Sequence, residues 1–120
     1  MRICLINVPN TYELVGNDPV IIKDQQGVYP PLGILYIASV LKNRGFEVHV
    51  IDAQATGDDH EEVAEKVLQM KPDLVGITAM TFTLVDCKLV VQAIRKRLKT
   101  KIVVGGPHTA IYPDECFSPE

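Results

Sequence analysis

The sequence predicts one α/β domain, built on a doubly wound parallel sheet with helices on both of its faces. Four short apolar runs have the length and residue types of buried strands, and they occupy 3–8, 47–52, 74–78 and 102–105. Helix-forming segments separate these runs, so strands and helices alternate along the chain. Because crossovers between parallel strands are right-handed, this alternation places helices on both faces. A length of 120 residues with 47% hydrophobic content fits one domain with its own core.

A long segment without periodicity follows the first predicted strand, which Pro9-Asn10 closes. Residues 11–29 show no consistent hydrophobic period and contain turn-forming clusters at 16–19 and 23–27. A compact domain rarely keeps so long a loop without a use. The segment leaves the carboxyl end of its strand, which is the edge where ligands bind in such sheets.

The first helix is expected at 32–43, between two breakers. Pro30 and Pro31 pre-set its start, and Arg44-Gly45 ends it, with the glycine available for a left-handed cap. Apolar residues occur on nearly all sides of this segment. That distribution predicts a helix with little exposed surface.

The second half of the chain repeats the pattern of helix and strand. Asp58 and Asp59 are expected to cap a helix over 60–70, whose apolar residues recur at helical spacing. A third helix is expected to open at Phe82 or Thr83 and to lead into the fourth strand.

Two adjacent glycines, Gly105 and Gly106, stand at the carboxyl end of the fourth strand. They remove both Cβ atoms at a place where backbone and ligand could touch. The flavodoxin-like strand order 2-1-3-4 puts the switch point between the first and third strands, where the loops at 8–29 and 79–82 converge. We therefore expect a small-molecule site at this edge, against the alternative of a tight turn without a ligand.

Several common functions of doubly wound domains lack their signatures here. The formal charge of −3 argues against a nucleic-acid binder, and no segment approaches the length of a membrane span. The residues after the first strand, 7–12, read Asn-Val-Pro-Asn-Thr-Tyr, so neither a dinucleotide fingerprint nor a phosphate loop is present. Asn7 and Thr78 stand where a receiver domain needs acids, and no nucleophile elbow occurs. The residues indicate a binding module with no catalytic residue and no metal ligand.

The cysteines and the amino terminus indicate a reducing compartment. Cys4, Cys87 and Cys116 are odd in number and have no metal-ligand spacing. Cys4 and Cys87 are expected to be small buried apolar groups. The apolar run after Met1-Arg2 is too short for a signal peptide, so a cytoplasmic location is expected.

Four segments together carry a family resemblance. They are Pro-Pro-Leu-Gly-Ile-Leu-Tyr-Ile-Ala at 30–38, Val-His-Val-Ile-Asp-Ala at 48–53, Gly-Ile-Thr at 76–78 and Val-Gly-Gly-Pro-His-Thr at 104–109. In this order they resemble the amino-terminal cobalamin-binding domain of cobalamin-dependent radical S-adenosylmethionine enzymes. That class includes methyltransferases and the anaerobic magnesium-protoporphyrin monomethyl ester cyclases. The resemblance extends over nearly the whole chain, from residue 3 to about residue 115.

The wider cobalamin-binding family uses three motifs, and this sequence matches two of them. The motif Asp-x-His-x-x-Gly after the first strand is absent, and no histidine precedes His49. This departure, shared with the radical subgroup, implies that cobalamin is bound without a protein imidazole on cobalt. The motif Ser-x-Leu is matched with substitutions by residues 78–80, Thr-Ala-Met, and the Gly-Gly pair by Gly105 and Gly106.

The resemblance implies a cofactor site at the carboxyl edge of the sheet. The nucleotide tail of cobalamin would insert beside the sheet, where the two glycines leave backbone without side chains and the Thr78 hydroxyl offers a hydrogen bond. Gly106→Val is accordingly expected to block corrin binding while leaving the fold intact. The other histidines, His49 and His60, are expected on the solvated surface. The implied cofactor-binding residues are Asn7, Pro9, Thr78, Met80, Thr81, Gly105, Gly106, Pro107 and His108.

Because a doubly wound domain usually has five or more strands, the four predicted strands indicate a sheet that lacks its final strand. The resemblance also implies that residues 1–120 are the amino-terminal domain of a longer enzyme. S-adenosylmethionine and a 4Fe–4S cluster would belong to a downstream radical domain, because no Cys-x-x-x-Cys-x-x-Cys run occurs here. An exposed sheet edge would favour dimerisation. Two alternatives stay open at this point: a non-enzymatic flavodoxin-like regulatory or protein-interaction domain, and the nucleotide-sugar-binding half of a transferase. The second lacks a placed charged group to hold a diphosphate.

Overall fold

A computed structural model describes residues 1–10 and 30–116 of the chain. The expected loop at 11–29 therefore lies outside the described residues. The strands are β1 (Arg2–Asn7), β2 (Glu47–Asp52), β3 (Leu74–Thr78) and β4 (Lys101–Gly105). The helical elements are α2 (Leu32–Asn43), α3 (Ala53–Thr56), α4 (His60–Met70), the 3-10 turn η1 (Thr81–Thr83), α5 (Leu84–Arg97), α6 (Pro107–Ile111) and α7 (Pro113–Cys116).

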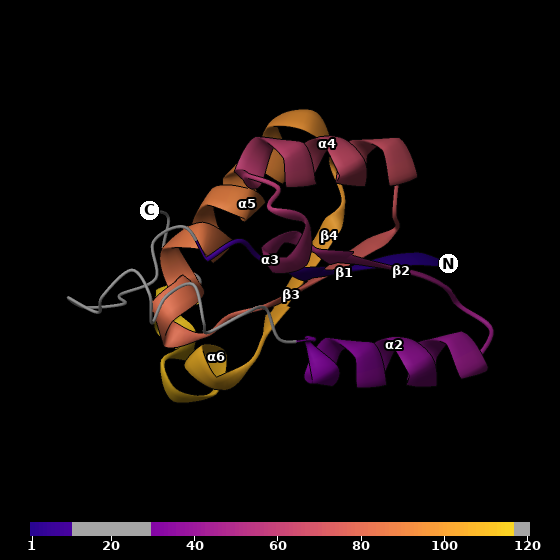
Figure 1. Ribbon diagram of the computed structural model, residues 1–120, viewed down its shortest axis with the longest axis horizontal. Helices are drawn as coiled ribbons and strands as arrows, with labels where there is room; N and C mark the ends of the chain where they lie inside the picture. The colour runs from indigo at the N-terminus through magenta and orange to yellow at the C-terminus, as the bar shows by residue number, and fades with distance from the viewer. Residues whose placement is uncertain (11–29, 117–120) are drawn as a thin grey trace.

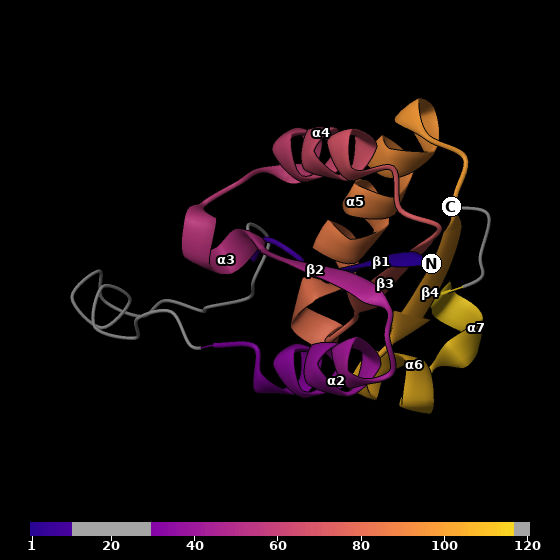
Figure 2. The ribbon, with the colours of Figure 1, turned by 90° about the vertical axis from the view of Figure 1, so that its right-hand side faces the viewer.

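The strands form one parallel sheet in the order β2-β1-β3-β4, which confirms the predicted fold class and strand order. Ile3 lies opposite Val48 on β2 and Leu74 on β3. Helices cover both faces of the sheet, with α4 and α5 on one side and α2 on the other (Figures 1 and 2). In the described part of the chain, β2 and β4 are the edge strands. Pairing of two copies through such an edge stays a prediction.

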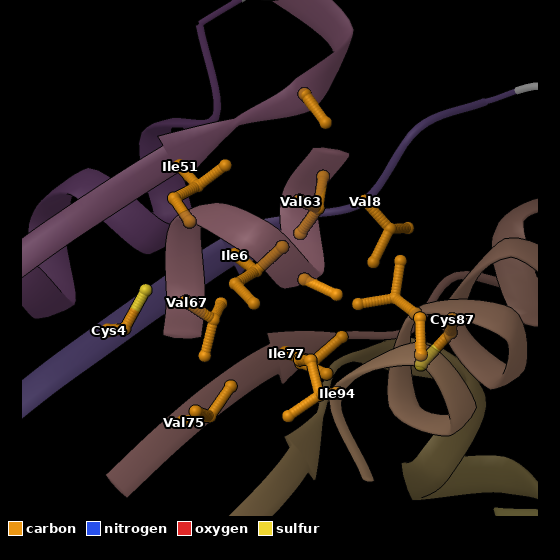
Figure 3. Packing of buried hydrophobic residues seen from close by; sticks show 14 of the residues in the cluster. Cys4, Ile6, Val8, Ile51, Val63, Val67, Val75, Ile77, Cys87 and Ile94 are labelled. Atoms are coloured by element: carbon orange, nitrogen blue, oxygen red, sulfur yellow. The ribbon is translucent and has the colours of Figure 1, made fainter. Parts of the chain in front are cut away.

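The main hydrophobic core lies between the sheet and the pair α4–α5 (Figure 3). Alternation along β1 directs Cys4 and Ile6 into this core, and β3 contributes Val75 and Ile77. Burying one Val or Ile side chain contributes roughly 1.5–3 kcal/mol relative to leaving it exposed. The helices supply Val63, Val67, Val90 and Ile94, which are fully buried.

The opposite face of the sheet is covered much less completely. Its buried cluster consists of Ile3, Leu5 and Ile34. Ile34 is the one buried residue of α2, whereas Leu32 is 73% exposed and Tyr36 is 76% exposed. The prediction that this helix has little exposed surface is therefore wrong. In the described residues, α2 is the only long helix on this face, so its outward side chains have no neighbouring helix to pack against (Figure 2).

The helix ends follow the sequence signals closely. Gly45 has a φ of 91° after α2, as a left-handed cap requires. Asp59 caps α4, because its carboxylate accepts a hydrogen bond of 2.8 Å from the N–H of Glu62. Asp58 instead forms an ion pair with Lys66. The hydrogen bonds that it accepts from Lys66 and from Thr56 hold the pKa of Asp58 below its ordinary value.

No helix in the described residues is long and apolar enough to cross a membrane.

Candidate functional site at the carboxyl edge of the sheet

The ends of three neighbouring strands bring the predicted site residues together. Asn7 ends β1, Thr78 ends β3 and Gly105 ends β4. Thr78 lies opposite Gly105, and Asn7 lies opposite Asp52, in the parallel register. The switch point predicted from the strand order therefore lies between Asn7 and Thr78.

A cleft of about 360 Å³ opens at this switch point. It lies between the start of α2 and the loop that follows β3. Three of the predicted site residues, Asn7, Thr78 and Met80, line it, together with Pro31, Leu32, Gly33, Ile34, Gln54 and Thr83. Sequence reasoning missed Gln54, because α3, the short helix that carries it, was not predicted.

A chain of hydrogen bonds holds the floor of this cleft. Nδ2 of Asn7 donates to Oδ1 of Asp52 over 2.9 Å, and Asp52 also caps α3 by accepting from the N–H of Ala55. Gln54 donates from Nε2 to the carbonyl of Val8 over 3.2 Å. Asn7 is more than nine-tenths buried, and its carboxamide oxygen is of a type that accepts hydrogen bonds. The cleft therefore contains polar side chains, held in place by these hydrogen bonds, that a ligand could contact.

An apolar groove of about 500 Å³ runs down the sheet from the same edge, beneath α2. Its floor is formed by β1, β3 and β4, and Val103 on β4 is 55% exposed there. Gly105, Gly106 and Pro107 close its upper end. Thr78 lines both the cleft and the groove, so the cleft, with its mixed polar and apolar lining, continues into the apolar slot.

The two glycines of the corner have different roles. A Cβ on Gly105 would meet no atom within 4 Å, so its missing side chain leaves open space in the groove. A Cβ on Gly106 would lie 2.8 Å from both the Ala79 carbonyl oxygen and Oγ1 of Thr78. Gly106 also has a φ of 106°, which side chains rarely allow. The expectation that Gly106→Val leaves the fold intact is therefore wrong, because the backbone itself requires this glycine.

Backbone hydrogen bonds explain why the chain passes so closely at Gly106. The N–H of Ala79 donates to the Gly105 carbonyl over 2.7 Å, and the N–H of His108 donates to the Ala79 carbonyl over 3.1 Å. These bonds join the loop after β3 to the start of α6. The corner is thus held between two strand ends by backbone hydrogen bonds of this chain alone.

The remaining predicted site residues line neither cavity. Pro9 is buried next to the end of β1. Thr81 and His108 contact each other, with Oγ1 of Thr81 3.2 Å from Nδ1 of His108. His108 is 3% exposed and its ring lies 5.4 Å from the ring of Tyr112. In the structure, this histidine links α6 to the loop after β3.

Comparison with known proteins decides the family. The B12 binding domain model matches residues 19–120, which is more than half of the chain. The chain belongs to the B12-binding domain family. The predicted resemblance to the cobalamin-binding domains of radical S-adenosylmethionine enzymes is confirmed by the relatives and by the fold.

Two relatives of the B12-binding domain illustrate this context. An uncharacterized methyltransferase of Pyrococcus horikoshii is 34% identical over 87 residues, which are 71% of this chain and 18% of that protein. The anaerobic magnesium-protoporphyrin IX monomethyl ester cyclase of Rubrivivax gelatinosus is 36% identical over 91 residues, 72% of this chain and 16% of that protein. The chain thus spans less than a fifth of the length of either relative.

A solved structure shows the same fold. The radical S-adenosylmethionine methyltransferase TsrM of Kitasatospora setae, with tryptophan substrate and a S-adenosylmethionine analogue bound, superposes with a TM-score of 0.69 at 19% identity. The match covers 93% of this chain and 20% of that chain. At this identity the likeness establishes the fold of the B12-binding domain alone.

The B12-binding domain also contains a buried pair that sequence reasoning missed. Nε2 of His60, at the start of α4, lies 2.8 Å from Oδ1 of Asp86, in the first turn of α5. The side chain of His60 is 18% exposed and that of Asp86 is fully buried, so the expectation of a solvated His60 is wrong. The sequence signal that could have indicated this pair is Asp86, an aspartate next to Cys87 on a helix face that is otherwise apolar. His49, by contrast, is on the surface as expected, paired with Glu47.

The described cysteines behave as the sequence predicts. Neither Cys4 nor Cys87 forms a disulfide, and both lie in the hydrophobic core. Burial raises the pKa of the Cys4 thiol to about 12, which leaves it neutral and unreactive near pH 7. Within residues 1–10 and 30–116, no cluster of three or more His, Cys, Asp or Glu side chains could hold a metal ion.

Proposed function

We propose that this B12-binding domain holds cobalamin with the corrin ring over the carboxyl edge of the sheet and the nucleotide tail in the apolar groove. The observation that carries the proposal is the junction at Thr78, where a cleft that contains the polar side chains of Asn7 and Gln54 continues into an almost wholly apolar slot. Cobalamin has two parts that suit these two sites: a large ring system with polar side groups for the cleft, and a flat aromatic base on a tail for the groove.

The groove suits the base at the end of the tail. The missing Cβ of Gly105 leaves a space that a flat ring can enter, and Ile34 and Ile37 of α2 supply an apolar wall. Burial of apolar surface contributes about 2.5 kcal/mol per 100 Å² removed from water. The Thr78 hydroxyl can satisfy a ring nitrogen or a tail oxygen, and an unpaired polar atom there would cost about 1–3 kcal/mol.

The cleft suits the polar rim of the corrin. Asn7 and Gln54 offer carboxamide groups, and Met80, which is 36% exposed, offers an apolar contact. The proposed site also includes residues of the segments that follow β1, β3 and β4, namely Pro9, Thr81, Pro107 and His108. When bound, cobalamin supplies a cobalt centre that can carry a methyl group. The residues of this chain bind and orient that cofactor.

The placement of the histidines supports binding without a protein imidazole on cobalt. The sequence contains three histidines, all of them in the described residues, and none lines the cleft or the groove. His49 pairs with Glu47 on the surface, His60 contacts the buried Asp86, and His108 contacts Thr81.

We propose further that residues 1–120 form the amino-terminal domain of a cytoplasmic radical S-adenosylmethionine methyltransferase or cyclase. The lengths of the relatives and the likeness to TsrM support a downstream domain that binds S-adenosylmethionine and a 4Fe–4S cluster. On this proposal the present domain binds cofactor and the downstream domain carries the chemistry.

Equilibrium dialysis of the 120-residue protein against hydroxocobalamin tests the binding proposal. We expect saturable uptake of one corrin, and Gly105→Val should weaken it at least tenfold, because the new side chain would extend into the slot from a Cβ that meets no other atom within 4 Å. Gln92→Val, on the exposed side of α5, is the matched control and should bind as the wild type does. Absence of uptake by the folded wild-type protein would contradict the proposal.

A further inference from the structure

A third glycine, Gly76, lies in the middle of β3 at the floor of the groove. Its neighbours across the sheet are Leu5 on β1 and Val103 on β4, and all three line the groove. Thr78 and Gly105 form the next pair toward the carboxyl edge. Gly76 therefore lies one step deeper in the slot than the Thr78–Gly105 junction.

The backbone does not require a glycine at this position. The positive-φ glycines of the described chain are Gly45, Gly57 and Gly106. Glycine in the interior of a strand weakens that strand and often marks a close approach by another group. The missing side chain of Gly76 therefore matters for the space above the strand and not for the backbone conformation.

The Leu5 side chain occupies part of that space. A Cβ on Gly76 would lie 2.7 Å from Cδ2 of Leu5, which is too close for any real contact. Leu5 is 8% exposed and leans across the sheet over the glycine. Any side chain at position 76 would make the groove shallower in two ways. It would add its own volume, and it would displace Leu5 toward the groove.

We propose that Gly76 is a specificity-determining residue, which keeps the groove deep enough for the bicyclic aromatic base of a complete corrinoid. This inference rests on the proposed function, because it assigns the tail of the corrinoid to the groove. The ligand class it selects is corrinoids whose nucleotide tail ends in a two-ring base. Corrinoids without that base would gain nothing from the depth of the slot.

The test compares two ligands, hydroxocobalamin and cobinamide, which lacks the nucleotide and its base. Equilibrium dialysis of the wild-type domain should give at least tenfold tighter binding of hydroxocobalamin. Gly76→Val should weaken hydroxocobalamin binding at least tenfold and change cobinamide binding less than twofold. Circular dichroism of each variant reports whether the strand still forms.

A rescue experiment keeps the proposal testable if Gly76→Val does not fold. Gly76→Ala alone should weaken hydroxocobalamin binding, and Leu5→Ala in the same chain should restore at least half of the lost affinity by removing the displaced side chain. Equal losses for both ligands in Gly76→Ala, or no rescue, would overturn the role of Gly76. Equally tight binding of both ligands by the wild type would also overturn it but leave corrin binding intact, whereas binding of neither ligand would overturn the proposed function as well.

Discussion

His60 and Asp86 join the starts of α4 and α5 through a contact of 2.8 Å between Nε2 and Oδ1. The two residues are 26 positions apart in the sequence, and the carboxylate is fully buried. A buried carboxylate is costly unless it keeps its partners. The pair therefore fixes the relative position of the two helices that cover the main core.

Substitution of this histidine should destabilise the fold. His60→Ala removes the imidazole that contacts the buried Asp86 side chain, and the loss of a hydrogen bond to such a group costs roughly 1.5–3 kcal/mol. Urea denaturation of the purified domain measures the change in the free energy of unfolding. His49→Ala is the matched control, since His49 pairs with Glu47 on the surface and should contribute little. Equal effects of the two substitutions would contradict the structural role of the buried pair.

The two glycines of the corner should differ in their tolerance of alanine. Gly106→Ala forces a side chain into a positive-φ backbone and against the Ala79 carbonyl, so we expect a loss of roughly 1–3 kcal/mol in stability. Gly105→Ala meets no atom within 4 Å and should change stability by less than about 0.5 kcal/mol. Thermal unfolding of the two variants checks the difference, and similar melting temperatures would show that the corner is not rigid.

The Cys4 thiol should make stability depend on alkaline pH. Its folded pKa of about 12 lies above the ordinary value of 9.0, so the fold favours the neutral thiol. The corresponding stability is complete below pH 9.0 and is lost as pH rises toward 12. Across this window the wild-type free energy of unfolding should fall about 1.4 kcal/mol per pH unit more steeply than that of Cys4→Ala. Parallel pH profiles from urea denaturation of the two proteins would contradict this.

The two sides of α2 should respond differently to truncation. Ile34→Ala deletes the one buried side chain of the helix and should cost roughly 2–4 kcal/mol. Tyr36→Ala removes a side chain that is 76% exposed, and its cost should stay within about 0.5 kcal/mol. Both values come from urea denaturation of the 120-residue domain. A large cost at Tyr36 would mean that the outward side of α2 is covered in solution.

The sequence by itself determined the order and type of the main elements. Apolar runs, helical spacing and breakers are local signals, so the strands, the three long helices and the caps at Gly45 and Asp59 follow from them. The strand order 2-1-3-4 is the flavodoxin-like order that we expected for a doubly wound sheet with this alternation of elements. The meeting of Asn7, Thr78 and Gly105 at one edge of the sheet was also predictable, because residues at the carboxyl ends of neighbouring parallel strands lie at the same edge.

Only the tertiary structure decided which side chains are covered, and which glycine leaves open space in the groove and which one the backbone requires. The exposure of α2 depends on how many helices share its face, and the division between Gly105 and Gly106 depends on how closely Ala79 passes. The contact of His60 with Asp86 joins two helices that no local pattern relates. These features depend on distances between segments far apart in the chain. A hydrophobic period shows which residues can be buried, and packing decides which of them are.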